Sequence, residues 1–446
     1  MVIRKLINFS PARIILISIM STISIGTLLL SLPIAQLKAI PLIDLFFTST
    51  SATCVTGLFT IPITDFTFFG HCVLLALIQI GGIGLITMTV FFMSLFVNFG
   101  LATQLMTGQL LDIEQWGHVK KIVLFIISLT VLTELIGATL TFFAIQYDYS
   151  LSQAIFLSLF HSVSSFCNAG ISLFPKGIQT YNHSYLMLST TIGLILIGGL
   201  GFLTWKELFS YWKIRWQKKW KKISLTTKII LYGTVGLTLL GALVFYCFES
   251  QKMNINNPVL IVLNSILQGL GFRGTGYTVI NVMQMSNVTL FIAMVLAFIG
   301  FAPGSTGSGI KITTFVLFLA TIRSAIHGRT SVEIKERQIP KDQIYKSTAI
   351  IALSMAWIFA ATLVLLTTET GFGVFSIFFE ATSAFATLGM SLGVTTGLSL
   401  IGKLVIITSM IVGRIGSLTL ILALRKIALG LKARAITYPE ERVTLS

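Results

Sequence analysis

Apolar residues run along this chain in long stretches with few polar interruptions. A run of about 20 mostly apolar residues is long enough to cross the hydrocarbon core of a bilayer as a helix. Runs of this kind lie near residues 13–32, 70–97, 122–145, 185–212, 229–248, 286–326, 347–367 and 400–430. Because backbone groups in lipid must be satisfied internally, the pattern predicts an all-α integral membrane protein.

A shorter apolar segment lies inside each successive pair of long runs. These segments lie near residues 42–53, 151–166, 258–270 and 374–385, and each leads into a glycine. They are too short to cross a bilayer. We therefore expect re-entrant pore helices, which are tolerated at membrane depth where they line a cavity or are buried in protein.

The glycines after the short segments recur at near-regular intervals, separated by 113, 106 and 113 residues. This first set comprises Gly57, Gly170, Gly276 and Gly389. A second set, found 24 residues later in three units and 28 residues later in the second unit, comprises Gly81, Gly198, Gly300 and Gly413. Such self-similarity indicates a repeated module. We expect four pseudo-repeats of transmembrane helix, re-entrant pore helix and transmembrane helix around one central pore.

The spacing divides the chain into four repeats and a tail. The predicted repeats cover residues 1–117, 118–222, 223–340 and 341–434, and residues 435–446 form a predicted cytoplasmic C-terminal tail. In the third repeat the second helix is expected to be broken, because the stretch from Gly300 to Lys311 contains four glycines and a proline. We expect a polar loop there, in a water-filled cavity below the pore helices; a plain kink is the alternative.

The composition excludes a soluble globule. Hydrophobic residues make up 54% and charged residues 10% of the chain, against about 25% charged in soluble domains, and the mean hydropathy is +0.91. The net charge of +16 would suit nucleic acid if the basic residues formed one solvated face. They lie instead in short loops between apolar runs, so we expect no nucleic-acid partner.

Lysines and arginines are distributed unequally over the predicted loops. With the N-terminus inside, 24 of the 31 lie on the inner side, and only Lys38, Lys176 and Lys252 lie on the outer side. This bias is a positive-inside signal. It predicts a multi-pass protein of the plasma (inner) membrane with both termini cytoplasmic. The first apolar run has no small-residue cleavage site, so we expect it to be retained as a span.

A glycine after a half-membrane helix allows backbone angles closed to other residues, so that consecutive carbonyls can point at one axis. Four such segments form a ring of oxygens that replaces the hydration shell of a monovalent cation. The predicted ion-binding (selectivity filter) residues are Val55, Thr56, Gly57, Asn168, Ala169, Gly170, Gly274, Thr275, Gly276, Thr387, Leu388 and Gly389. None of them is acidic, which argues against a carboxylate ring for divalent ions.

Arg414 occupies, in the fourth repeat, the place that corresponds to the start of the broken stretch. A guanidinium at membrane depth is costly unless it faces a cavity or a partner, so it marks function by default. Our hypothesis is that Arg414 lies near the loop and adds an electrostatic barrier to cation passage. The alternative is a structural pair with a buried carboxylate or carbonyl.

These motifs together resemble the Trk/Ktr/HKT superfamily of potassium transporters. The resemblance covers nearly the whole chain and is greatest to the Ktr-type membrane subunit. Besides the four repeats, it rests on Thr53-Cys54-Val55-Thr56-Gly57-Leu58, Asn168-Ala169-Gly170, the stretch from Gly300 to Lys311, and Ile411-Val412-Gly413-Arg414-Ile415-Gly416. Glycine at all four filter positions matches the potassium-selective members, whereas members that favour sodium often carry serine at the first position.

The resemblance implies the pore-forming subunit of a potassium uptake system, with K⁺ as the transported ion and Na⁺ as an activator left open. It also implies one pore per protomer, a homodimer, and a cytoplasmic nucleotide-binding regulatory ring, KtrA-like and of the RCK type. It assigns the broken stretch to an intramembrane gating loop. The gating residues are then Gly300, Pro303, Gly304, Ser305, Thr306, Gly307, Ser308, Gly309, Lys311 and Arg414.

The main alternative is a sodium-permeable or Na⁺-coupled cation transporter of the same superfamily. A carrier for an organic solute would instead show two inverted halves. An enzyme would need a nucleophile and base or a metal motif, and none is recognisable. No GxGxxG motif follows a predicted strand, so nucleotide sensing is assigned to a partner and no organic cofactor is expected in this chain.

Two further features leave alternatives open. Glu134 and Glu380 are acids in apolar surroundings, which suits either ion coupling or structural support of the filter. The basic run from Lys213 to Lys222 is interleaved with tryptophans. It suits an amphipathic helix on membrane lipid, or the docking of a cytoplasmic partner.

Overall fold

The computed structural model describes residues 11–84, 119–216, 222–329 and 331–416. The predicted tail at 435–446, the first repeat boundary at 117–118 and the far ends of the apolar runs near 70–97 and 400–430 lie outside the described residues. Within these residues the only sheet is a two-stranded antiparallel hairpin of β2 (Glu333–Ile334) and β3 (Arg337–Gln338). The fold is otherwise helical.

The helices follow one another in the predicted repeat order. Repeat 1 contains α2 (Pro11–Leu30), α3 (Leu42–Cys54) and α4 (Phe68–Ile83). Repeat 2 contains α7 (Val119–Ile145), α8 (Leu151–Phe166), α9 (Tyr185–Gly199) and α10 (Phe202–Trp216). Repeat 3 contains α11 (Leu225–Glu249), α12 (Pro258–Gly271), α13 (Asn287–Phe298) and α14 (Ile312–Ile326). Repeat 4 contains α15 (Lys341–Thr368), α16 (Val374–Ala386) and α17 (Leu400–Ile415).

The connections contain short ordered pieces. These are β1 (Pro175–Ile178) and the 3-10 turns η1 (Pro33–Ala35), η2 (Ile63–Asp65), η4 (Gln179–Tyr181), η5 (Ser250–Met253), η6 (Val282–Gln284) and η7 (Thr395–Gly397). The four short apolar segments of the sequence are the pore helices α3, α8, α12 and α16, whose ends lie within one residue of the predicted ones. The predicted fold class is confirmed: the chain is helical and consists of four units, each with a first helix, a pore helix and a second helix.

Three helical stretches within the described residues are long and apolar enough to cross a membrane unaided: Lys121–Ile145, Leu225–Met253 and Lys341–Thr368. The pair α9 and α10 makes a fourth if it is counted as one span. The other apolar helices, including α2, α4, α13, α14 and α17, are shorter over the residues described. The chain is a multi-pass membrane protein.

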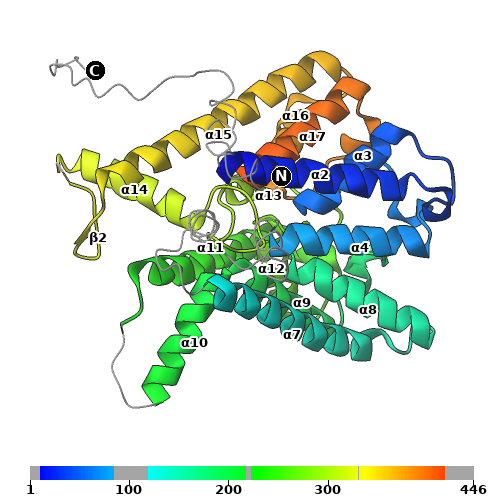
Figure 1. Cartoon of the computed structure of the whole chain (residues 1–446), viewed down its shortest axis with the longest axis horizontal. Helices are drawn as coiled ribbons and strands as arrows, with labels where there is room; N and C mark the ends of the chain where they lie inside the picture. Colours follow the sequence, from blue (N-terminus) through cyan, green and yellow to red (C-terminus); the bar gives the residue numbers. More distant parts are fainter. Residues whose placement is uncertain (1–10, 85–118, 217–221, 330, 417–446) are drawn as a thin grey trace, which may run out of the picture.

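The four repeats form a closed ring in which each contacts the next. Helix α4 contacts α8, α9 contacts α12, α13 contacts α16, and α17 contacts α3. Apolar clusters lie at all four boundaries: one between repeats 1 and 2, one that runs from repeat 2 through repeat 3 into repeat 4, and one between repeats 4 and 1. Figure 1 shows the repeats as successive colours around the middle of the molecule. This arrangement brings the ends of the four pore helices together.

Within a repeat, the second helix packs directly onto the end of the pore helix through a glycine. A methyl group added to Gly81 would lie 2.0 Å from the carbonyl oxygen of Thr53. The corresponding distances are 2.0 Å from Gly198 to the Phe166 oxygen and 1.7 Å from Gly413 to the Phe385 oxygen. Small residues permit this backbone contact. In repeat 3 it is absent, because Gly300 faces the carbonyl oxygen of Ser308 instead.

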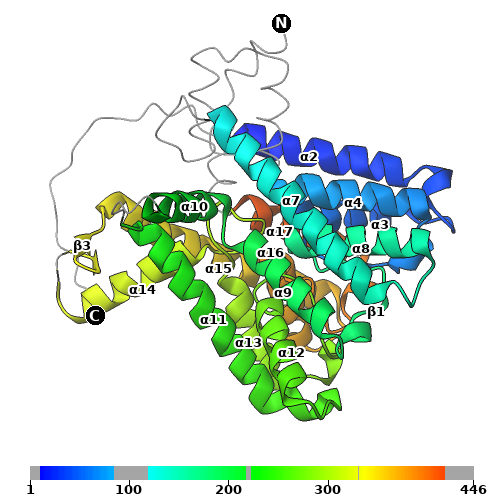
Figure 2. The same cartoon turned by 90° about the horizontal axis from the view of Figure 1, so that it is seen from below.

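The prediction of one continuous span over 185–212 is wrong. Helices α9 and α10 meet at a bend of 97°, and Figure 2 shows α10 turned away from α9. The break lies at Gly201, which has a φ of +85° and would hold a methyl 2.7 Å from the carbonyl oxygen of Pro303. The helix therefore breaks where the loop of repeat 3 packs against it. Within the described residues, the second helices of repeats 2 and 3 are both interrupted.

All four second helices begin with a hydroxyl N-cap. Thr67, Ser184, Ser286 and Ser399 each accept a hydrogen bond from the backbone N–H three residues later. Such caps satisfy one of the free donors of a helix start.

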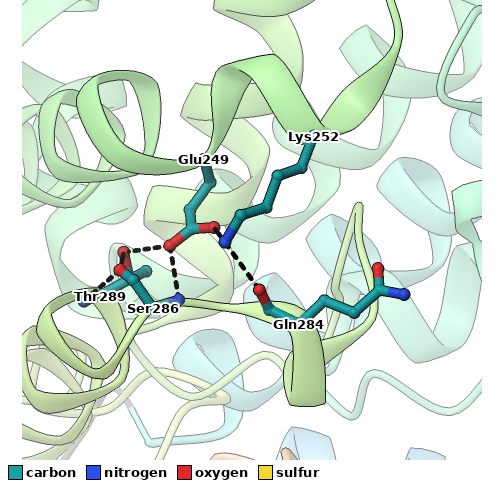
Figure 3. Close-up of polar contacts among 5 residues, drawn as sticks. All are labelled: Glu249, Lys252, Gln284, Ser286 and Thr289. Carbon is teal, nitrogen blue, oxygen red and sulfur yellow. Dashed lines mark hydrogen bonds and ion pairs between the residues drawn. The ribbon is translucent and has the colours of Figure 1, made fainter.

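In repeats 3 and 4 a buried glutamate from the end of the first helix adds a second anchor to the capping serine. Glu249 is fully buried and accepts bonds from the Ser286 N–H at 2.8 Å and the Thr289 hydroxyl at 2.7 Å. Lys252 pairs with its other oxygen at 2.7 Å (Figure 3). In repeat 4, Glu369 accepts from Ser399 N–H and hydroxyl groups in the same way. Each carboxylate thus ties the two long helices of its repeat together near one end.

We predict that Glu249→Gln lowers the free energy of unfolding by about 1–3 kcal/mol, because it removes a charge that satisfies three buried or half-buried donors. The thermal midpoint of the detergent-solubilised protein, followed by size-exclusion chromatography, measures the effect. Glu336→Gln, at an exposed position of the β2–β3 turn, is the matched control and should leave the midpoint unchanged. Equal midpoints for both variants would contradict an anchoring role.

Candidate ion pathway

The segment after each pore helix has the same unusual backbone in all four repeats. The first residue has a positive φ: 57° at Val55, 61° at Asn168, 107° at Gly274 and 50° at Thr387. The third residue is the glycine of each unit, with φ of 88°, 63°, 71° and 82° in chain order. The residue between them is not left-handed. In a regular β-strand, successive residues point to opposite sides. Here the backbone alternates between left-handed and other conformations, which allows successive carbonyl groups to face one axis.

The four segments contact one another in cyclic order. A methyl on Gly57 would lie 2.6 Å from the Ala169 oxygen of repeat 2, and one on Gly170 would lie 2.1 Å from the Thr275 oxygen of repeat 3. One on Gly276 would lie 3.1 Å from the Leu388 oxygen of repeat 4. The ring closes where Gly389 faces the Thr56 oxygen at 2.2 Å. The structure thus brings all twelve predicted filter residues together, with the carbonyls of Thr56, Ala169, Thr275 and Leu388 at the contacts.

Buried hydroxyls without a protein partner gather on these segments. Among the described residues, Thr53 Oγ1, Thr56 Oγ1 and Thr275 Oγ1 accept and donate no hydrogen bond within the protein. Buried polar groups are normally satisfied. Their position beside the carbonyl ring fits a path used by water or a hydrated cation.

Side chains behind the ring fix the segments. Ser51 Oγ accepts from the Gly57 N–H at 3.1 Å, and the Ser383 hydroxyl donates to the Met390 carbonyl at 2.6 Å. Tyr277 reaches across to repeat 2, where its hydroxyl lies 2.9 Å from that of Ser165. Glu380 accepts from Ser391 at 2.7 Å and also from Thr395. Through its bonds to Ser391 and Thr395, Glu380 holds the chain after the fourth segment in place. This fits structural support of the segment better than a role in ion coupling.

An ion pair joins the first and last repeats. Lys403 of α17 lies 2.6 Å from Asp44 Oδ1 at the start of α3, and both side chains are largely buried. The Thr60 hydroxyl donates to the same carboxylate oxygen at 2.7 Å. The pair adds a polar contact at the junction that closes the ring.

The predicted gating loop lies directly beneath the filter. Thr306 is its centre: it is fully buried, and its hydroxyl donates to the Phe166 carbonyl at 3.0 Å. The Asn168 side-chain amide donates to the same hydroxyl at 2.5 Å, so a filter residue contacts the loop. The Thr306 N–H donates to the Gly198 carbonyl at 3.2 Å. The loop is therefore attached to the end of α8 and to α9.

Basic side chains hold the other part of the loop. Arg414 donates to the Thr306 carbonyl at 2.6 Å and to the Ser308 hydroxyl at 2.8 Å, and it also donates to the Gly81 carbonyl of repeat 1. Lys311 folds back onto the Gly307 carbonyl at 2.7 Å. Neither cation has a carboxylate partner among the described residues. Two basic side chains therefore bond to the loop that contacts Asn168.

The remaining predicted gating residues divide into two groups. Gly300 and Gly309 belong to the base of the loop, where the Gly300 N–H donates to the Ile310 carbonyl at 2.8 Å. Pro303, Gly304 and Ser305 lie at the α9–α10 break, where the Phe202 N–H donates to the Gly304 carbonyl at 3.0 Å.

Some features of the pathway were not predicted from the sequence. The α9–α10 break was missed, although Gly198, Gly199 and Gly201 lie close together and could have signalled it. Lys403 and Asp44 were not singled out, because a pair between residues so far apart leaves no local pattern. Glu134 accepts from the Gln79 amide at 3.0 Å, a contact between repeats 1 and 2. The basic run at 213–222 begins in α10, and residues 217–221 lie outside the described ranges.

Comparisons with known proteins find relatives along nearly the whole chain. The TrkH family, described as "Cation transport protein", matches residues 10–429. The chain is 34% identical to "Ktr system potassium uptake protein B" of Bacillus subtilis over 98% of this chain and 97% of that protein. It is 31% identical to "Potassium/sodium uptake protein NtpJ" of Enterococcus hirae over 98% of both.

The fold is also similar to a solved structure. The crystal structure of the potassium transporter TrkH from Vibrio parahaemolyticus matches with a TM-score of 0.68 and 20% sequence identity, over 86% of this chain and 79% of that one. The shared fold, the family match along nearly the whole sequence and the full-length relatives show that this chain belongs to the TrkH family of cation transport proteins.

Proposed function

We propose that this chain is the pore-forming subunit of a potassium uptake system, which conducts K⁺ through the four-segment carbonyl ring and is gated by the intramembrane loop. The observation that carries the proposal is the cyclic contact of the four filter glycines with the carbonyls of the next repeat. A ring of backbone oxygens without acidic side chains suits a monovalent cation. The relative from Bacillus subtilis is named a potassium uptake protein, which supports K⁺ as the cargo.

Sodium is the competing cargo. The relative from Enterococcus hirae is named a potassium/sodium uptake protein at 31% identity. This supports the alternative of a sodium-permeable or Na⁺-coupled transporter with the same pore, and Na⁺ as an activator. The selectivity measurement below separates the two.

The loop is proposed to close the path in the described conformation. It lies beneath the ring, bonded to Asn168 of repeat 2, and Arg414 holds it from the neighbouring repeat 4. The Arg414 guanidinium adds positive charge where a cation would pass, which raises the electrostatic barrier. Opening then requires that these hydrogen bonds break together.

The assembly follows the proposed role. We place the chain in the plasma (inner) membrane with both termini cytoplasmic, in line with the bias of its basic residues. The relatives named as parts of a Ktr system support a multicomponent complex. We propose a homodimer opened by a cytoplasmic nucleotide-binding ring of the RCK type.

Gly57→Ser is expected to weaken discrimination between Rb⁺ and Na⁺ by about tenfold. The side chain would have to adopt a φ of +88° and would approach the Ala169 carbonyl oxygen, so the ring must distort. The measurement is rubidium influx with sodium competition, in a host that lacks its own potassium uptake systems and is supplied with a cognate ring subunit. Gly236→Ser, on an open face of α11, is the control and should behave as wild type. If the wild-type protein admits Na⁺ as readily as Rb⁺, the proposal that the pore selects potassium is wrong.

Arg414→Ala is expected to raise basal rubidium influx, measured without the ring subunit, by about tenfold. The substitution removes two hydrogen bonds to the loop, a third to the Gly81 carbonyl of repeat 1, and one positive charge on the proposed path. Arg323→Ala, at an exposed site on α14, is the matched control. Equal basal influx in wild type and Arg414→Ala would refute the barrier.

A further inference from the structure

Arg273 is a buried cation that the pathway described above does not use. It directly precedes Gly274, the first residue of the third filter segment, and its side chain is fully buried. Its guanidinium donates to the Gly300 carbonyl at 3.2 Å and to the Thr238 hydroxyl at 3.3 Å. A longer contact of 3.5 Å reaches the Thr234 carbonyl. The guanidinium also lies 4.5 Å from the centre of the Phe301 ring.

These partners belong to two elements outside the third filter segment. Thr234 and Thr238 lie on α11, the first helix of the repeat, and Gly300 and Phe301 begin the gating loop. One side chain therefore links the filter segment, the first helix and the root of the loop. The corresponding positions in the other repeats, Cys54, Cys167 and Ala386, have side chains too short for such a link.

The link lies where the repeat lacks its usual packing. In the other three repeats, a glycine of the second helix lies against the carbonyl of the last or penultimate residue of the pore helix, which fixes the two elements directly. In repeat 3 that glycine, Gly300, faces Ser308 of the loop instead. The insertion of the loop has displaced the backbone contact, and the bond from Arg273 to the Gly300 carbonyl spans the gap.

The third filter segment is held closely on one side and loosely on the other, because a methyl on Gly170 of repeat 2 would lie 2.1 Å from its Thr275 carbonyl oxygen. The contact of Gly276 with the next repeat is the loosest of the four ring contacts, 3.1 Å against 2.1–2.6 Å. Repeats 1 and 4 fix their segments with Ser51 and Ser383, and the third repeat has Leu270 at this position. The chain after the third segment is held by Tyr277, which bonds to Ser165, and by Gln268, which accepts from the Val279 N–H at 2.9 Å, but the side of the segment that faces repeat 4 has only the loose contact of Gly276.

A full charge at this depth is costly, and none of the partners of Arg273 among the described residues is a carboxylate. Neutral carbonyls, a hydroxyl and a ring face compensate it only in part. A residue that served only to pack this buried position would be apolar. The guanidinium is suited to a different task, because its planar fork contacts several groups on separate elements at once.

We propose that Arg273 is a positioning residue that ties the third filter segment to the root of the gating loop, so that loop position and ion discrimination are coupled. The proposal rests on the proposed function of the pore. When the Gly300 carbonyl moves with the loop, the tether displaces Gly274 and the ring loses its regular spacing. When the loop is in place, the tether holds the third segment against its neighbours.

Arg273→Met tests the tether with the rubidium influx assay and sodium competition, on full-length protein with the ring subunit and at matched amounts in the membrane. It should lower discrimination between Rb⁺ and Na⁺ by about tenfold, equivalent to about 1.4 kcal/mol. Arg273→Lys, which keeps the charge but has no fork, should give an intermediate value. A purely structural role would reduce the amount of protein and leave the discrimination ratio of the folded fraction unchanged, which would overturn the proposal.

Two threonines on α11 provide a milder pair of variants if Arg273→Met does not fold. Thr238→Val removes the hydroxyl that Arg273 contacts. Thr234→Val removes a buried hydroxyl one turn away that has no partner in the described structure. Thr238→Val should lower discrimination and Thr234→Val should not, and the effect of Thr238→Val should vanish in an Arg273→Met background. Equal ratios for both valine variants would overturn the tether.

Wild type separates failure of the tether from failure of the pore. Selective rubidium influx in wild type together with an unchanged ratio in the Arg273 and Thr238 variants overturns the tether alone. Absence of rubidium influx in wild type supplied with the ring overturns the proposed function and the tether with it.

Discussion

The close approach of four backbone segments to one another is the constraint on which the rest of this structure depends. At each filter glycine, a single methyl group would meet the carbonyl oxygen of the next repeat. Such contacts tolerate no side chain, so the pore helices must end at fixed distances from one axis. A second layer of glycines, on the second helices of three repeats, sets those distances by direct contact with the carbonyl of the last or penultimate pore-helix residue. Backbone packing, rather than side-chain packing, thus defines the ring.

The third repeat departs from this scheme, and the proposed gate lies at this departure. The loop interrupts its second helix and occupies the space where the glycine contact would be. The second repeat accommodates the loop with the 97° bend between α9 and α10. Asn168 and Arg414 bond to the loop from two other repeats, and Arg273 bonds to its root. The ring therefore has one irregular repeat, whose loop contacts the proposed filter directly.

The sequence predicted the features that are repeated and local. The pore helices α3, α8, α12 and α16 were found because their short apolar runs end at turns that require glycine, a signal written four times at near-regular spacing. The broken helix of repeat 3 was found because proline and several glycines cannot remain helical together. The bend at Gly201 was missed, because the nearby glycines also suit close packing of continuous helices. The Glu249 and Asp44 contacts were missed because they join residues that only the folded chain brings together.

Potassium selectivity of this ring is the property on which the proposed function depends most. Bi-ionic recordings from the wild-type chain with a cognate ring subunit, reconstituted in planar bilayers with K⁺ on one side and Na⁺ on the other, test it directly. If the ring selects K⁺, the reversal potential lies far from zero, displaced toward the equilibrium potential of K⁺. A reversal potential near zero would mean that the ring conducts both ions equally, and it would contradict the assignment of the four glycine segments as a potassium filter.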